Sequence, residues 1–298
     1  MKLKYLKQEE GFLGIKDNYL SSIDDAKAVI IPFGLESSVS YEGGTKNGPY
    51  AIIEASKQVE LFDEEFWIEP YEKYGVATLE EFKIDDNLEK SLLQIEKINE
   101  QLLNNNKFPL TIGGEHSITA GAIRPFIKKY QDLAILHFDA HADLRDGYEG
   151  QYYSHAAALR RVMDNDISTL ISCGIRNISK EEIPYLQDNE NRIKIYFAKD
   201  KKKWNIDEMI EPLKNRPVYI TFDLDGFDSS LMQATGTPEP GGLIWDEVIE
   251  IIKKASEICN IVGADVVELS PIKGFHSCDF LAAKLCYKIL NYALSNKS

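Results

Sequence analysis

Short apolar runs alternate with longer amphipathic segments along most of this chain. The runs predict eight strands, at residues 26–34, 75–79, 108–114, 133–139, 169–175, 192–198, 217–223 and 261–269. Most of them lack the polar–apolar alternation of a half-exposed strand, which indicates that both faces of a parallel sheet are buried.

Helical periodicity marks two of the longer stretches between these runs. Residues 87–105 and residues 245–258 place apolar side chains three or four positions apart, as an amphipathic helix does. Strands that alternate with helices predict an α/β fold with right-handed crossovers. No repeat, low-complexity tract or Pro/Ser-rich linker interrupts the pattern, so we expect one domain over residues 1–298.

Composition narrows the classes of function. The chain has 34 Lys and Arg against 48 Asp and Glu, a formal net charge of -14. This acidity argues against a general nucleic-acid or anionic-membrane binder and is compatible with a cationic substrate. The N-terminal segment lacks the apolar core of a signal peptide. Four cysteines show no metal-binding spacing, which favours reduced, packed thiols and a cytoplasmic protein.

Polar side chains follow several of the predicted strands, and they suggest a metal site. Asp139, His141 and Asp143 occupy every second position in the segment "LHFDAHAD". Asp223 and Asp225 have the same spacing in "TFDLDGFD". His116 follows a glycine pair at the end of a third strand; the carboxyl ends of parallel strands share one edge of the sheet. The chain must curl after Asp139 for its neighbours to converge.

Four carboxylates brought together would repel one another unless divalent cations neutralise them. One metal would use four of the six groups, and six candidates fit two metals better. Carboxylate-rich ligation without thiolate suits Mn²⁺, although imidazole also admits Zn²⁺, Fe²⁺ or Ni²⁺. His137 is expected to support the site by hydrogen bonding rather than to bind metal, and His276 is interpreted as structural.

Six segments of the chain resemble the signature segments of the ureohydrolases, the arginase and agmatinase family. They are "SVSYEGGTKNGPYAI" (38–52), "GGEHS" (113–117), "DAHADLR" (139–145), "TFDLDGFD" (221–228), "TGTPEPGGL" (235–243) and "DVVELSP" (265–271). The matches follow the family order over about residues 30 to 290. Glu115 stands where Asp is commoner, and "DGFDSS" lacks a proline often found after the last Asp.

The resemblance implies a three-layer α/β/α fold with a mainly parallel sheet of about eight strands and a site with two manganese ions. Carried over to this chain, one ion would be held by His116, Asp139, Asp143 and Asp223, and the other by Asp139, His141, Asp223 and Asp225. Glu268 would bind the substrate guanidinium. Asp143 would relay a proton to the departing amine, and His155 would shuttle protons or contact substrate. The family commonly forms trimers or hexamers.

The substrate implied is a guanidino compound that yields urea and an amine. The loop "LRDGYEGQYYSHA" resembles agmatinase loops, and we expect Asp146 and Glu149 near the mouth to disfavour the carboxylate of arginine. Agmatine, hydrolysed to putrescine and urea, is therefore favoured over guanidinobutyrate and arginine. Arg145 complicates this inference, because it would pair either with Asp146 or with an acidic substrate.

Two other classes of function remain as alternatives. A metal-dependent deacetylase would hold a single zinc ion, and metal stoichiometry separates it from a site with two ions. A non-catalytic binding or scaffold protein would release no urea from any guanidine.

Overall fold

Eight parallel strands form one central sheet in the computed structural model, which describes residues 2–16, 25–38 and 43–295. The strands are β1 (Ala28–Phe33), β2 (Val76–Thr78), β3 (Phe108–Gly113), β4 (Ala134–Phe138), β5 (Thr169–Ile175), β6 (Ile193–Phe197), β7 (Pro217–Asp223) and β8 (Asn260–Val267). Their order across the sheet is β2-β1-β3-β8-β7-β4-β5-β6. Every predicted strand is present, and its ends differ from the prediction by no more than two residues.

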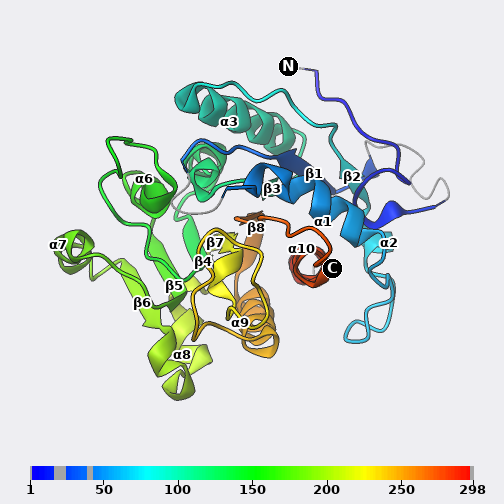
Figure 1. The fold of residues 1–298 in the computed structure, drawn as a ribbon. Coiled ribbons are helices and arrows are strands. Elements are labelled where there is room, and N and C mark those ends of the chain that lie inside the picture. Colours follow the sequence, from blue (N-terminus) through cyan, green and yellow to red (C-terminus); the bar gives the residue numbers. More distant parts are fainter. Residues whose placement is uncertain (1, 17–24, 39–42, 296–298) are drawn as a thin grey trace.

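Helices cover both faces of this sheet (Figure 1). Packed together on one face are α1 (Gly48–Ser56), α2 (Tyr71–Tyr74), α8 (Ile206–Ile210), α9 (Trp245–Ile258) and α10 (Ser277–Leu294). On the other face lie α3 (Leu88–Asn104), α4 (Thr119–Ala122), α5 (Arg124–Lys129) and α6 (Ala158–Met163), with α7 (Ile183–Asp188) beyond them. The expected three-layer α/β/α fold is confirmed, while the single domain over residues 1–298 stays a prediction.

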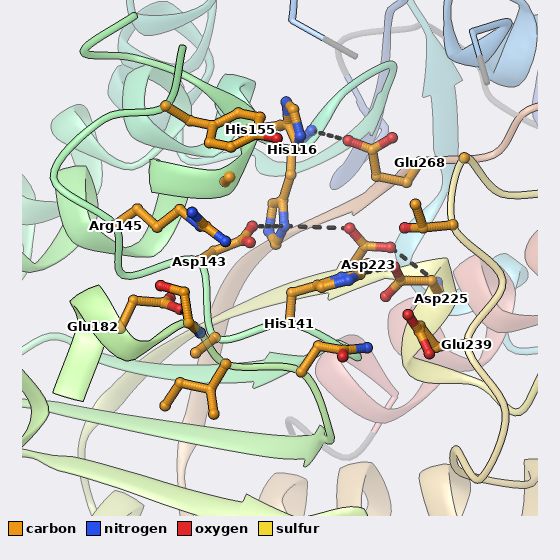
Figure 2. Close-up of a pocket in the computed structure, with 18 of the residues that line it drawn as sticks. His116, His141, Asp143, Arg145, His155, Glu182, Asp223, Asp225, Glu239 and Glu268 are labelled. Carbon is orange, nitrogen blue, oxygen red and sulfur yellow. Dashed lines mark hydrogen bonds and ion pairs between the residues drawn. The ribbon is translucent and has the colours of Figure 1, made fainter. Parts of the chain in front are cut away.

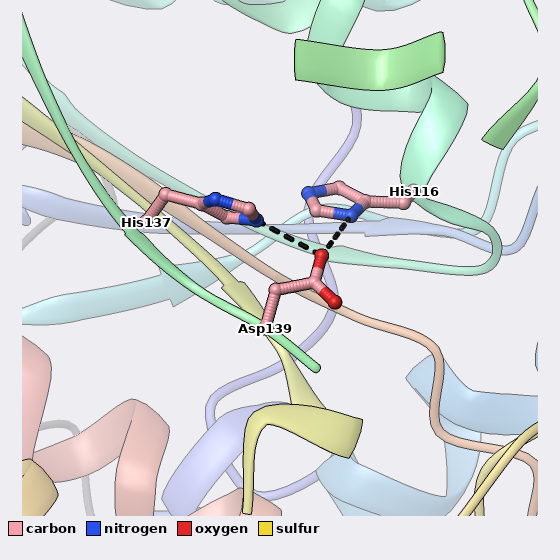
Figure 3. A group of neighbouring side chains, drawn as sticks. All are labelled: His116, His137 and Asp139. Carbon is pink, nitrogen blue, oxygen red and sulfur yellow. Dashed lines mark hydrogen bonds and ion pairs between the residues drawn. The ribbon is translucent and has the colours of Figure 1, made fainter. Parts of the chain in front are cut away.

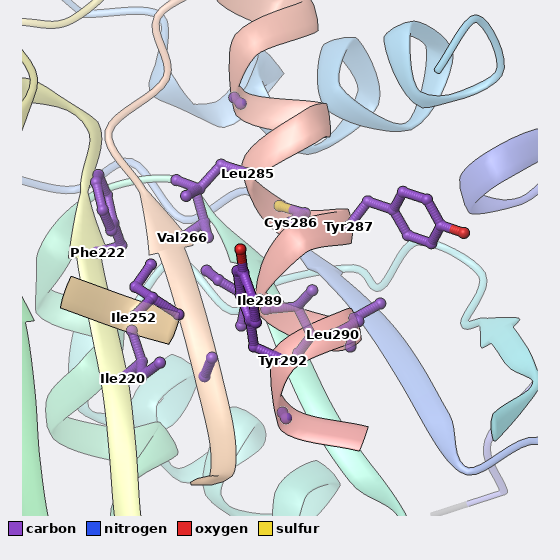
Figure 4. Packing of buried hydrophobic residues seen from close by; sticks show 14 of the residues in the cluster. Ile220, Phe222, Ile252, Val266, Leu285, Cys286, Tyr287, Ile289, Leu290 and Tyr292 are labelled. Carbon is purple, nitrogen blue, oxygen red and sulfur yellow. The ribbon is translucent and has the colours of Figure 1, made fainter. Parts of the chain in front are cut away.

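Alternate residues of each central strand enter the cores on the two faces. Ile220 and Phe222 of β7 and Val266 of β8 pack toward α9 and α10, where Leu285 and Ile289 meet them (Figure 4). Residues of opposite parity, such as Ile135 of β4, pack under the helices of the other face. Burial on both faces explains why the strands read as continuous apolar runs. The edge strand β6 is only partly buried.

The strand order sets the position of the site. β3, β8, β7 and β4 are consecutive in the middle of the sheet, although β8 comes last along the chain. Their carboxyl ends therefore meet at one place, and residues far apart in sequence become neighbours there. Within the described part of the chain, no helix is long and apolar enough to span a membrane. All four cysteines are free thiols, as expected from their spacing.

Candidate metal centre and cavity

Each predicted metal ligand lies at the carboxyl end of one of three central strands. His116 begins a short 3-10 helix after β3, Asp139 follows β4 directly, and Asp223 is the last residue of β7. His141 and Asp143 lie in the loop after Asp139. Asp143 has a φ of 53°, a left-handed conformation that contributes to the curl expected of this loop. His116, His141, Asp143 and Asp223 line one cavity (Figure 2), whereas Asp139 is buried beside them.

Close backbone approach at two glycines makes this convergence possible. A Cβ atom on Gly114, two residues before His116, would lie 1.9 Å from the carbonyl oxygen of Leu35. A Cβ atom on Gly226 would lie 2.8 Å from the backbone nitrogen of Asp139. Any larger residue at either position would displace the loops that carry the candidate ligands.

The first group of ligands surrounds the imidazole of His116. Its Nδ1 atom lies 3.0 Å from Asp143 Oδ2, 3.2 Å from Asp139 Oδ2 and 3.4 Å from Asp223 Oδ2. Asp139 is fully buried, and its Oδ2 atom is also 2.9 Å from His137 Nε2 (Figure 3). Three carboxylates thus point toward one histidine nitrogen.

The second group surrounds His141. Its Nδ1 atom lies 3.0 Å from Asp225 Oδ2 and 3.5 Å from Asp139 Oδ1. Asp139 therefore turns one oxygen toward each histidine, which is the arrangement required of a carboxylate shared by two ions. Asp223 links the groups in a different way, since its Oδ1 atom accepts a hydrogen bond of 2.9 Å from the Asp225 backbone.

In the absence of a cation, several of these buried carboxyl groups lack enough neutralising partners, and their pKa values are shifted. Burial raises the pKa of Asp223 well above its usual value, and repulsion from Asp225 and Asp139 adds to this. Burial and then repulsion from Asp139 raise the pKa of Asp143 to about 7. For Asp139 burial also acts upward, but hydrogen bonds from the neighbouring histidines hold its pKa well below the usual value. Protein groups alone therefore leave two of these carboxyls uncompensated.

The donor set fits a divalent cation. The Nδ1 atom of His116 is buried and makes no hydrogen bond to any described residue, although three carboxylate oxygens surround it. An unbonded imidazole nitrogen among carboxylates is the combination that Mn²⁺ and similar ions bind. Two geometric groupings of three donors occur in the described residues, namely His116 with His137 and Asp139, and His141 with Asp139 and Asp225.

Above this cluster lies a cavity of about 310 Å³. Glu268 follows β8 with a φ of 67°, and its Oε1 atom accepts a hydrogen bond of 2.6 Å from the His116 backbone (Figure 2). Burial and then repulsion from Glu115 raise the pKa of Glu268 to about 8. His155 also lines the cavity, and burial lowers its pKa to about 4.

The sequence expectations for the cavity mouth are partly wrong. Neither Asp146 nor Glu149 lines the cavity; Asp146 is paired instead with Arg161 at 2.5 Å. Arg145 does line the cavity. Its guanidinium lies 3.7 Å from the carboxylate of Glu181, and among the described residues it forms no ion pair with its sequence neighbour Asp146. His276 is exposed and is not among the lining residues. Residues 39–42, part of the segment 38–52, lie outside the described residues.

Several residues that line the cavity were not predicted from the sequence to have a role in it. Glu182 accepts a hydrogen bond of 2.8 Å from the Leu144 backbone and so braces the loop that carries Asp143. Glu239 lies in the quoted segment 235–243 but had been given no role. The remaining unassigned residues are Ser38, Ala142, Tyr148, Ala156, Asn177, Ile178, Ser179, Gly236 and Thr237.

Comparison with known proteins agrees with this geometry. The model of the Arginase family matches residues 26–291. The chain belongs to the arginase family. Its relatives in that family include the N(1)-aminopropylagmatine ureohydrolase of a Synechocystis species, 34% identical over 93% of this chain and 92% of that protein. They also include the agmatinase of Bacillus cereus, 36% identical over 84% of this chain and 86% of that protein.

Solved structures of the arginase family share the fold. The crystal structure of the agmatine ureohydrolase of Thermoplasma volcanium superposes with a TM-score of 0.81 at 33% identity, covering 93% of this chain and 92% of that one. The putative agmatinase from Clostridium difficile gives a TM-score of 0.82 at 26% identity over 93% of this chain and 100% of that one. Membership in this family makes a hydrolase with two metal ions the relevant class for the cluster.

Proposed function

We propose that this chain is a manganese-dependent agmatinase that hydrolyses agmatine to putrescine and urea. The observation that carries the proposal is the pair of donor groups joined by Asp139, which lies under a cavity whose described lining holds more acidic than basic side chains. One manganese ion would be held by His116, Asp139, Asp143 and Asp223. The other would be held by Asp139, His141, Asp223 and Asp225.

The metal pair, when bound, would lower the pKa of a water molecule that it holds. Glu268 would receive the guanidinium, because its ionised carboxylate offers charge-assisted hydrogen bonds to two N–H groups. One oxygen of Glu268 is fixed by the His116 backbone, which orients the carboxylate at the cavity wall. A cation bound there would also favour the ionised form of this carboxyl.

Two other side chains would handle protons. Asp143 lines the cavity as well as belonging to the cluster, so it would pass a proton to the departing amine. His155 is neutral at ordinary pH because burial lowers its pKa to about 4. Its Nδ1 atom lies 3.1 Å from Ser38 Oγ, and the ring would exchange protons with the cavity that it lines.

The charge of the cavity supports a substrate without a carboxylate. Its described lining contains six acidic side chains, three of them outside the metal cluster (Glu182, Glu239 and Glu268), against one Arg or Lys, Arg145. Arg145 already has neighbours within the protein, since it lies 3.7 Å from Glu181 and 5.0 Å from the ring centre of Tyr148. An acidic guanidine would therefore find little compensation for its charge, whereas a second ammonium group would. N1-aminopropylagmatine is the second candidate, because relatives of that name match nearly the whole chain.

Urea release from metal-loaded protein tests the proposal. The panel is agmatine, N1-aminopropylagmatine, guanidinobutyrate and arginine, with kcat/KM expected to be highest for agmatine. A second reading comes from Glu268→Gln, which should retain two metal ions per chain and raise KM. No urea from any of the four guanidines would refute the activity; one bound metal per chain would point to the deacetylase alternative.

The setting of the enzyme is part of the same proposal. Free, mostly buried thiols support a cytoplasmic location. A trimer or hexamer is proposed from the family resemblance, and light scattering coupled to size-exclusion chromatography measures it.

A further inference from the structure

A row of buried polar side chains crosses the sheet just below the metal cluster. Strand register aligns Thr111 of β3, Asp265 of β8, Thr221 of β7, His137 of β4 and Ser172 of β5 as successive neighbours. All five residues are fully buried. Burying such a row of polar side chains in the middle of a sheet costs free energy unless they form hydrogen bonds with one another or with the groups above them.

Asp265 is the charged member of this row, and hydroxyl groups surround it. Its Oδ1 atom accepts a hydrogen bond of 2.7 Å from Thr221, and its Oδ2 atom accepts bonds of 3.0 Å from Thr119 and 2.8 Å from Tyr219. Burial raises the pKa of this carboxyl, and the nearby His116 and the three hydroxyls oppose that shift. Asp265 thus acts as a hydrogen-bond acceptor on both oxygens.

The hydroxyl of Thr221 connects this carboxylate to His116. Its Oγ1 atom lies 2.9 Å from His116 Nε2. A hydroxyl has one hydrogen, and that of Thr221 is used on Asp265, so toward His116 the oxygen accepts. The Nε2 atom of His116 must then carry a hydrogen. The neutral ring consequently keeps its lone pair on Nδ1, the atom that the three carboxylates surround.

We propose that Asp265 and Thr221 are positioning residues, which fix the ring orientation and tautomer of His116 so that Nδ1 is presented to a metal ion. This inference rests on the metal centre of the proposed function. Neither residue reaches the cavity, so neither touches substrate. Outer hydrogen bonds of this kind hold a ligand ring in place and increase its basicity.

The test is a titration of metal-free, full-length protein with Mn²⁺, in which free Mn²⁺ is followed by electron paramagnetic resonance. Thr221→Val keeps the shape of the side chain and removes the hydroxyl. We expect one of the two ions to bind about 10- to 100-fold more weakly, as is typical when an outer partner of a histidine ligand is lost. The ion held largely by His141 and Asp225 should change much less. Thr221→Ser keeps the hydroxyl and should restore wild-type affinity.

Two control variants separate positioning from a general structural effect. Thr111→Val removes a buried hydroxyl of the same row that makes no hydrogen bond to any described residue. Tyr219→Phe removes one of the hydrogen bonds to Asp265 but leaves the contact between Thr221 and His116 intact. Both should bind two ions with wild-type affinity, even where the thermal unfolding midpoint of Tyr219→Phe falls.

The outcomes distinguish this inference from the proposed function. Wild-type affinity in Thr221→Val, or equal weakening in Thr111→Val, overturns the positioning role while the metal centre stands. Failure of the wild-type chain to bind Mn²⁺ overturns both. If Thr221→Val does not fold, Thr221→Ala takes its place in the titration. A loss of manganese affinity in Thr221→Ser, which keeps the hydroxyl, also contradicts the proposal.

Discussion

Two clusters of buried charge within the described residues are balanced in different ways. Beneath α10, Asp63 is paired with Lys288 at 2.8 Å and accepts a further bond of 2.8 Å from Asn291. In the cluster at the carboxyl ends of β3, β4 and β7, four aspartates face two imidazoles. One cluster is neutralised by the chain itself, whereas the other has an excess of negative charge.

The pKa directions follow this difference. Burial would raise the pKa of Asp63, but the hydrogen bond from Lys288, then those from the Glu65 backbone and Asn291, bring it below its usual value. For Asp223 and Asp143, burial and mutual repulsion leave the pKa raised. A buried cluster that the protein completes contributes to the fold, while one that it leaves incomplete is suited to a ligand of opposite charge.

Among the variants that test this comparison, Asp223→Ala is expected to have the largest effect on manganese binding and activity. In the proposed metal centre both ions share this carboxylate, so its loss should remove bound manganese and reduce urea release from agmatine to background. The metal-free variant should be at least as stable as the metal-free wild type, because a buried, repelled carboxyl has gone. Metal analysis measures the loss of manganese, and thermal unfolding measures the stability of the metal-free variant. Full turnover by Asp223→Ala would contradict the bridging role. His141→Ala should lose activity similarly.

A strong effect of the opposite kind is expected from Lys288→Met. It leaves Asp63 buried without its counter-charge, which should lower the free energy of unfolding by about 3–5 kcal/mol. Urea denaturation measures this loss, while kcat/KM per folded molecule should stay unchanged. Glu64→Gln is the matched control: Glu64 lies 3.7 Å from Lys288 but its side chain is 72% exposed, so stability should change by less than about 0.5 kcal/mol. Equal losses in both variants would break the comparison.

A graded effect is expected from pH. The pKa of Asp143 is about 7 in the absence of metal, so protons compete with manganese below that pH. Manganese affinity should fall as the pH is lowered through 7, by about tenfold per pH unit for each proton displaced. Asp63 behaves differently: its pKa is lowered, so its contribution to stability is present above its usual value of 3.8 and is lost only below that. Affinity independent of pH between 6 and 8 would argue against these carboxyls as ligands.

Much of the fold could be predicted from the sequence because buried strands leave a strong local signal. The runs at 169–175 and 217–223 match β5 and β7 to the residue. The convergence of His116, Asp139 and Asp223 was also predictable, since each lies at or just after the end of an apolar run and parallel strands share one edge. Those signals need only the order of residues along the chain and the geometry of a sheet.

The rest depends on contacts that no local pattern reveals. Asp146 looked like a residue of the mouth until its pairing with Arg161 placed it elsewhere. Glu115 was noted only as standing where Asp is commoner, yet its carboxylate accepts hydrogen bonds from the backbone of Ser37 and Ser38 and so holds that segment beside His155. Thr221 and Asp265 did leave a signal, since each is a polar residue inside an apolar run, but their meaning required the strand register.

The position of β8 also bears on how the protein is made. β8 contains Asp265 and is followed directly by Glu268, and it lies between β3 and β7, which are synthesised before it. A nascent chain that has emerged as far as residue 226 holds all six proposed ligands, but the centre of its sheet has a gap between β3 and β7. We therefore expect the proposed metal centre to be complete only once β8, which ends at residue 267 of 298, has been synthesised and inserted between β3 and β7.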